Sequence, residues 1–104
     1  MLKWEEKAKE AYLKYENEPT YVKAYRKGDL YVVHGEITIL CFNKNFEKLW
    51  EFCARDIWIT TDDSEAIVLH NKYIQLKDWL GYVYKLDYQG RLISEDSSGA
   101  RIDE

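Results

Sequence analysis

The chain has 104 residues, of which 46% are hydrophobic, and it carries a formal net charge of −4. A chain of this length is expected to form one domain with one modest core. The last ten residues carry a net charge of −3, so the rest of the chain is close to neutral. A neutral body lacks the basic surface that neutralises phosphates, which argues against nucleic acid as a partner.

The cellular compartment is suggested by the cysteines and by hydropathy. Cys41 and Cys53 are the only cysteines, and they form no CxxC pattern. Two free thiols favour a reducing compartment. No apolar run approaches 18 residues, and the segment from Lys3, which reads KWEE, lacks the basic and then apolar order of a signal peptide. We therefore expect a cytoplasmic protein with no membrane partner.

Residues 2–16 are predicted to form an amphipathic helix. The apolar positions follow the helical period along one stripe: Trp4, Ala8, Ala11, Tyr12 and Tyr15. Asn17 and Pro19 end the helix, because the residue before a proline is disfavoured in the helical region. The two alanines would let this helix lie close to a sheet.

After Pro19 the apolar period changes to two, which predicts antiparallel strands over residues 21–95. The expected strands are 21–25, Leu30–Val33, Ile37–Phe42, 57–61, Ala66–His70, Tyr82–Leu86 and Arg91–Glu95, while Lys72–Trp79 suits either a strand or a helical turn. The fold class is thus α+β, with the helix packed on an antiparallel β-meander. Residues 1–96 are expected to be a single globular domain, and residues 97–104 a disordered acidic tail.

The hairpin around Lys44-Asn45 allows its register to be predicted. If these two residues form the loop, Ile39 faces Trp50 and Ile37 faces Phe52 on one side. On the other side Thr38 faces Glu51 and Phe42 faces Glu47. This register separates the apolar positions from most of the polar ones, which a slip of one residue would destroy. The core face is then built from Ile37, Ile39, Trp50 and Phe52.

A strand-and-hairpin unit occurs twice in the sequence. Asp29–Phe52 and Glu65–Glu95 each begin with an apolar strand that ends in histidine and a turn former, His34-Gly35 and His70-Asn71. Each closes with a hairpin that has a polar turn, Asn43-Lys44-Asn45 and Asp87-Tyr88-Gln89-Gly90. The pattern predicts a meander built from two hairpin repeats.

The segments ILCFNKNFEKLWEF and VYKLDYQGRLI, about a quarter of the chain, carry a family resemblance. Each has a strand, an Asp or Asn turn and a second apolar strand, and in this they resemble the blade hairpins of PQQ-type β-propellers. The resemblance implies four-stranded meander units. Two units are too few to close a ring of the usual four to eight blades. It implies no cofactor, and the alternative to a single α+β domain is a homodimer that shares sheet edges.

The residues that could carry chemistry have simpler structural explanations. His34 and His70 could bind a metal, but no third ligand stands at metal-binding spacing. Asp62, Asp63 and Glu65 lie in an expected turn, where shared solvent gives them no opposed pKa values. No nucleophile motif or phosphate-binding loop is present. We therefore expect neither an enzyme nor a metal or cofactor site.

Aromatic residues exceed what a small core can hold: the chain has nine Tyr and four Trp. Some must be exposed, and Trp and Tyr dominate binding energy at protein interfaces. The segment Tyr73–Tyr84 is the expected contact face. Together with the acidic turn, the predicted partner-binding residues are Asp62, Asp63, Glu65, Tyr73, Asp78, Trp79, Tyr82 and Tyr84.

These features favour a protein-binding inhibitor. In size and composition the chain looks like small bacterial toxin-immunity proteins, and this likeness implies that it occludes the active site of a basic toxin domain. Two alternatives use the same features: a phage or accessory inhibitor of a host system, and a structural protein that self-assembles through sheet edges.

Overall fold

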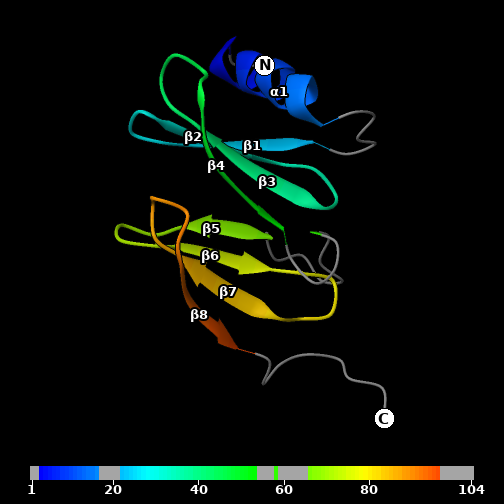
Figure 1. The fold of residues 1–104 in the computed structure, drawn as a ribbon, viewed down its shortest axis with the longest axis vertical. Coiled ribbons are helices and arrows are strands. Elements are labelled where there is room, and N and C mark those ends of the chain that lie inside the picture. Colours follow the sequence, from blue (N-terminus) through cyan, green and yellow to red (C-terminus); the bar gives the residue numbers. More distant parts are fainter. Residues whose placement is uncertain (1–2, 17–21, 54–57, 59–65, 97–104) are drawn as a thin grey trace. The chain divides into compact units, whose positions relative to one another are not determined.

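The structure of the chain is a computed structural model, which describes residues 3–16, 22–53, 58 and 66–96. The described residues form one N-terminal helix and two four-stranded antiparallel sheets (Figure 1). This confirms the α+β class. The chain divides into two compact units, Met1–Cys53 (unit 1) and Ala54–Glu104 (unit 2). The single domain over residues 1–96 stays a prediction.

Unit 1 begins with the predicted helix, α1 (Lys3–Tyr15), and continues with a meander in which each strand pairs with the next. Its strands are β1 (Lys23–Lys27), β2 (Leu30–His34), β3 (Thr38–Phe42) and β4 (Lys48–Cys53). The turn between β1 and β2 places Gly28 at φ 58°, a left-handed conformation that glycine adopts without steric cost.

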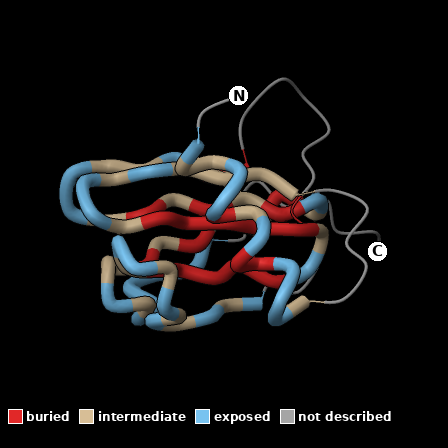
Figure 2. Tube along the Cα trace, turned by 90° about the horizontal axis from the view of Figure 1, so that it is seen from above, coloured by how far each residue is buried: buried red, intermediate tan, exposed pale blue. Residues whose placement is uncertain are grey.

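The apolar stripe of α1 packs on one face of this sheet. Ala8, Ala11 and Tyr12 are buried there. They form a core cluster with four sheet residues: Tyr31, Val33, Leu40 and Phe42. Small side chains on α1 allow its backbone to approach the strands closely, as the sequence predicts. Figure 2 shows continuous buried stretches along the trace and exposed or intermediate residues at its outer turns.

Tyr12 ties α1 to the turn between β2 and β3. Its hydroxyl donates a hydrogen bond of 2.8 Å to the carbonyl oxygen of Thr38, which also accepts from the backbone N–H of Gly35. Burial raises the pKa of Tyr12 to about 12, because the charged phenolate would lose its hydration. The polar tip of this ring is thus satisfied inside the core.

Unit 2 repeats the four-stranded meander. Its strands are β5 (Ile67–Leu69), β6 (Ile74–Lys77), β7 (Val83–Leu86) and β8 (Leu92–Asp96), in that order in the sheet. One face holds the fully buried side chains of Ile67, Ile74, Leu76 and Leu86. The ring of Trp58 packs edge-on against Tyr84, with centroids 5.8 Å apart. The segment from Lys72 to Trp79, ambiguous in the sequence, contains the strand β6.

A five-residue turn occurs three times in the two sheets. The three turns are Asn43–Glu47, Asp78–Tyr82 and Asp87–Arg91. In each, the backbone N–H of the first residue donates a hydrogen bond to the carbonyl oxygen of the fifth. The side-chain oxygen of the first residue accepts from the backbone N–H of the fifth. The fourth residue of each turn has a positive φ: Phe46 (61°), Gly81 (91°) and Gly90 (85°). Asn and Asp open these turns because their side chains bond the backbone of the turn itself.

The predicted register of the β3–β4 hairpin is wrong by two residues. Ile39 pairs with Phe52, and Cys41 pairs with Trp50. The cause is the turn, which spans Asn43–Glu47 instead of a two-residue loop, followed by a bulge at Leu49 between the Cys41–Trp50 and Phe42–Lys48 pairs. An even shift keeps Ile39, Trp50 and Phe52 on one face. The core cluster with α1 lies on the opposite face, which carries Leu40 and Phe42 and which the sequence had assigned to the polar side.

The remaining predicted pairs of this hairpin change as well. Thr38 pairs with Cys53 instead of Glu51, and Phe42 pairs with Lys48 instead of Glu47. Ile37, expected in the core opposite Phe52, lies exposed in the β2–β3 turn.

The internal repeat is real, but its phase differs from the sequence pattern. The closing turns correspond as predicted, since Asn43 and Asp87 open identical turns and a bulge follows each. The opening strands do not correspond, because β5 matches β1 and β6 matches β2 in sheet order. His34 therefore ends the second strand of its unit and His70 follows the first. The two histidines do not hold equivalent places.

Some predictions fall on residues outside the described part of the chain. These are the strand over 57–61, the acidic turn with Asp62, Asp63 and Glu65, and the tail over 97–104. The first strand, predicted over 21–25, is β1 and extends to Lys27. In the part of the chain that the structure describes, no helix is long and apolar enough to cross a membrane.

Candidate partner-binding surface

The structure separates the predicted contact residues of unit 2 into three places. Tyr73 stands just before β6, while Trp79 and Tyr82 lie in the turn after it. Six residues of strand span about 20 Å, so Tyr73 and Trp79 mark opposite ends of the sheet. Asp78 and Tyr84 are buried between them, with 1% and 3% of their surface exposed. One contiguous face over Tyr73–Tyr84 is therefore not formed.

Asp78 and Tyr84 support the fold of unit 2. The Tyr84 hydroxyl donates a hydrogen bond of 2.9 Å to Oδ2 of Asp78. The other carboxylate oxygen, Oδ1, accepts from the backbone N–H of Tyr82 at 3.0 Å. Both oxygens thus have partners within the unit, as a buried carboxylate requires. The pair holds the β6–β7 turn in place. The exposed residue of this turn is Trp79, and Tyr82 is half-buried.

The end of the sheet near Tyr73 is basic. His70 stacks on Tyr73 with ring centroids 4.4 Å apart, and Nζ of Lys85 lies 5.1 Å from the Tyr73 centroid. The Tyr88 hydroxyl donates to the carbonyl oxygen of His70. The carboxylate of Asp87 accepts two backbone N–H groups of its own turn. A cation that covers Tyr73 makes this end a poor site for a basic partner.

The opposite end combines aromatic and acidic groups with one lysine, Lys77, which pairs with Val83. Trp79 is 40% exposed in the β6–β7 turn, and Tyr82 is half-buried beside it. The last two residues of β8, Glu95 and Asp96, pair with Tyr84 and Val83, so they lie next to this turn. Both acids are exposed. We call Trp79, Tyr82, Glu95 and Asp96 the aromatic–acidic end of unit 2.

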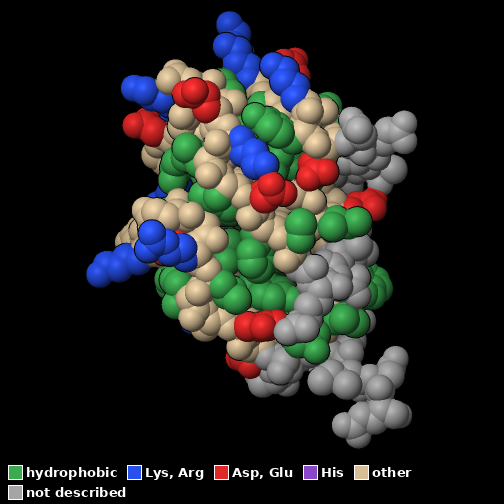
Figure 3. All heavy atoms as spheres, viewed as in Figure 1, with side chains coloured by type: hydrophobic (Ala, Val, Ile, Leu, Met, Phe, Trp, Pro, Cys, Tyr) green, Lys and Arg blue, Asp and Glu red, His purple; other side chains and the backbone are tan. Residues whose placement is uncertain are grey.

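The surface of unit 2 near β8 also exposes apolar side chains. Leu92 and Ile93, the first residues of β8, are 50% and 58% exposed. Figure 3 shows hydrophobic and acidic side chains together where Figure 1 draws this strand. The β8 residues were absent from the predicted contact set. The adjacent apolar residues Leu92-Ile93 break the period of two, and this break was the sequence signal for a bulge.

Unit 1 has a groove of about 440 Å³ between α1 and the β3–β4 turn. It is lined by Lys7, Glu10, Ala11, Lys14, Tyr15, Asn45 and Phe46. Its charged lining residues are two lysines and one glutamate, and this excess of positive charge does not suit the basic partner that the sequence predicts. We therefore place the candidate surface on unit 2.

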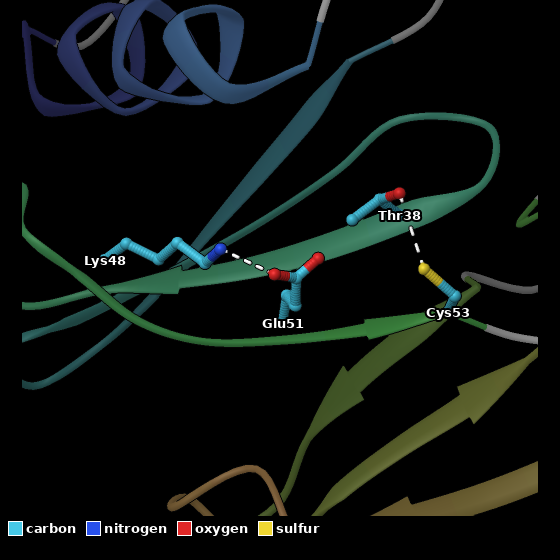
Figure 4. Close-up of polar contacts among 4 residues, drawn as sticks. All are labelled: Thr38, Lys48, Glu51 and Cys53. Atoms are coloured by element: carbon cyan, nitrogen blue, oxygen red, sulfur yellow. Dashed lines mark hydrogen bonds and ion pairs between the residues drawn. The ribbon is translucent and has the colours of Figure 1, made fainter.

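Two polar contacts of β3 and β4 are drawn in Figure 4. Lys48 forms a 2.6 Å ion pair with Glu51, and this bond raises the pKa of Lys48. Nζ of Lys48 also lies 5.2 Å from the ring centroid of Tyr15. Thr38 Oγ1 lies 3.5 Å from Sγ of Cys53. The Lys48–Glu51 pair lies within β4, the Lys48–Tyr15 contact joins β4 to α1, and the Thr38–Cys53 contact joins β3 to β4.

The cysteines and histidines are part of no metal-binding cluster among the described residues. Cys41 is buried and Cys53 exposed, both as free thiols. Burial raises the pKa of Cys41 to about 12, which disfavours its reactive thiolate. No cluster of three or more His, Cys, Asp or Glu that could hold a metal is found in the described part of the chain.

Comparisons with known proteins give no identity for this chain: no family model, curated protein or solved structure matches it.

Proposed function

We propose that this chain is a protein-binding inhibitor of the immunity class, which neutralises a basic toxin by occluding its active site. The observation that carries the proposal is the aromatic–acidic end of unit 2. There the turn that contains the exposed Trp79 lies next to the end of β8, which carries the exposed acids Glu95 and Asp96. A large ring that can be desolvated is the type of side chain that dominates the binding energy of protein interfaces.

The proposed mechanism is occlusion. Trp79 inserts into the cleft of the partner, where it loses its remaining contact with water. Glu95 and Asp96 then face basic groups around that cleft and increase the rate of association. Tyr82 contributes its ring to the rim of the contact. The buried Asp78–Tyr84 pair supports the turn that presents Trp79, which makes the turn rigid before binding and lowers the entropic cost of association.

The experiment that tests this function is capture of the partner from native cell extract, followed by an activity titration. The immobilised wild-type chain is expected to retain a single basic protein, and the purified pair to show one-to-one loss of that protein's activity. Trp79→Ala is expected to weaken binding by at least tenfold. Leu13→Ala, on the exposed side of α1, is the control and should bind like the wild type.

Two results would count against the proposal. A captured protein that keeps full activity in the complex would make the chain a binding protein without inhibitory function. A retained partner whose affinity is the same for wild type and Trp79→Ala would remove the aromatic–acidic end from the interface.

A further inference from the structure

We propose that β8 is a docking edge, which binds an extended segment of the partner as an added fifth strand of the unit 2 sheet. This inference rests on the proposed function and specifies which part of the partner is recognised. The segment is apolar at one end and basic at the other. In an antiparallel arrangement, its basic residues lie opposite Asp96 and Glu95 and its apolar residues opposite Ile93 and Leu92.

The position of β8 in the sheet is the first argument. In the sheet order β5-β6-β7-β8, β8 is an edge strand that pairs with β7. An edge strand presents backbone N–H and C=O groups on its outer side, and these can pair with another chain. All five residues of β8 are exposed.

Comparison with the other edge strands is the second argument. Proteins protect sheet edges with positive charge, short strands or bulges. β1 carries Lys23, Arg26 and Lys27, and β5 has only three residues. The remaining edge strand, β4, begins with Lys48 and has a bulge at Leu49. β8 has a bulge at Ile93, but it has five residues and no cation. It exposes Leu92 and Ile93 in succession, which offers a partner an apolar stretch of edge.

The charge along β8 is the third argument. The strand reads LISED, so two apolar residues are followed by a serine and two acids. A second copy of β8 pairing antiparallel would place Glu95 and Asp96 opposite Ile93 and Leu92 of that copy, which buries charge against apolar surface. A segment with lysine or arginine opposite Glu95 and Asp96, and apolar residues opposite Leu92 and Ile93, pairs favourably with both ends of the strand. The edge therefore selects a basic partner over self-association.

Continuity with the aromatic–acidic end is the fourth argument. Asp96 pairs with Val83, the residue after Tyr82, so the acidic end of β8 reaches the turn that carries Trp79. A partner strand added alongside β8 would therefore have its basic end close to this turn. One partner can thus contact both the edge and Trp79.

The test uses a short peptide in place of the unidentified partner. The probe is the capped peptide Lys-Lys-Thr-Val-Val, titrated to millimolar concentration into the full chain, with amide exchange followed residue by residue. We expect slower exchange of β8 amides and unchanged exchange in β5. The peptide Glu-Glu-Thr-Val-Val, with the same backbone and reversed charge, should bind about tenfold more weakly.

A matched pair of variants completes the test. Ile93 and Leu49 both lie at the bulge of the last strand in their units and are 58% and 49% exposed. Ile93→Lys is expected to weaken binding of the basic peptide about tenfold, and Leu49→Lys to leave it unchanged. Equal effects of the two variants, or no protection of β8 at saturating peptide, would overturn the docking edge.

The outcomes separate this inference from the proposed function. If a basic partner is captured and inhibited through Trp79 but the peptide gives no protection of β8, the docking edge is wrong and the inhibitor function stands. If β8 is protected as expected but no captured protein loses activity, the inhibitor function fails alone.

Discussion

Tyr12 shows how a single polar atom is accommodated in the core of unit 1. Its ring lies among the residues of the α1–sheet cluster, and its hydroxyl reaches the carbonyl oxygen of Thr38. The neutral phenol fits this place and the phenolate does not, since burial raises the pKa of Tyr12 from 10.0 to about 12. Cys41 behaves in the same way, with a pKa raised from 9.0 to about 12.

These shifts predict loss of stability at alkaline pH. A group whose pKa is higher in the folded chain contributes fully below its unfolded pKa, and the contribution disappears as pH rises to the folded value. The contribution of Tyr12 and Cys41 to the free energy of unfolding should therefore be constant below about pH 9 and fall between about pH 9 and 12. For Tyr12 the loss is at most about 3 kcal/mol.

The variant Tyr12→Phe isolates the contribution of the phenol. It should cost about 1 kcal/mol at neutral pH through the lost hydrogen bond. It should also reduce the fall in stability between about pH 10 and 12, because one titrating group is absent. Urea unfolding at a series of pH values measures both. An alkaline profile identical to that of the wild type would contradict the assignment.

Phe46 is the second residue whose environment predicts an unusual result. It occupies the left-handed position of its turn, at φ 61°, where the other two turns have glycine. Its ring stacks on Tyr31 with centroids 4.9 Å apart and planes inclined by 5°. The stack contributes about 1 kcal/mol and offsets a backbone cost of about 1–2 kcal/mol.

Two substitutions at this position separate backbone strain from stacking. Phe46→Ala loses the ring and keeps the strain, whereas Phe46→Gly loses both. The glycine variant should therefore be more stable than the alanine variant by about 1 kcal/mol. Thermal unfolding measures the difference. Lys44, whose φ is not positive, is the control position. There we expect Lys44→Ala to be more stable than Lys44→Gly. The same order of stability at both positions would show that the backbone of Phe46 is not strained.

At the scale of elements, α1 depends on small side chains. Ala8 is fully buried and Ala11 nearly so, which sets how closely the helix lies on β1 and β2. Ala8→Leu would overfill this contact and is expected to cost about 1–3 kcal/mol in the free energy of unfolding. Leu13→Ala, at an exposed position of the same helix, should stay within about 0.5 kcal/mol of the wild type. Equal effects at both positions would show that α1 is not packed as described.

The helix was predictable because its period, its alanines and its proline signal agree with one another. The antiparallel strands were predictable because the apolar period of two and the turn residues also agree with one another. The β3–β4 register was not, because it depends on the side chain of Asn43, which accepts backbone N–H bonds and extends the loop to Glu47. The sequence did not indicate this turn, because Phe46 stands at the position of positive φ where the other two turns have glycine.

The contact residues were partly predictable from composition. The surplus of aromatic rings indicated that some would be exposed, and Trp79 is. Periodicity could not show that Asp78 bonds Tyr84 in the interior, because an acid next to a tryptophan also fits a surface. The role of β8 depends on its place at the sheet edge, which only the pairing of strands reveals.

The whole molecule contains two meanders of the same topology, and the two differ in the residues that they expose. In unit 1 the helix covers one face of the sheet, and the last strand exposes Leu49 beside the Lys48–Glu51 ion pair. In unit 2 the last strand exposes Leu92 and Ile93 and ends in two acids. The repeated design supplies the scaffold, and the differences between the repeats supply the recognition that we propose.

Binding of a basic protein through Trp79 and the acids near it is best tested by a calorimetric titration. The purified captured partner is titrated with wild type and with Trp79→Ala, and its residual activity is measured at each step. We expect a one-to-one complex, loss of activity in proportion to binding, and an affinity at least tenfold lower for Trp79→Ala. Equal affinities for the two proteins, or a saturated complex with undiminished activity, would contradict it.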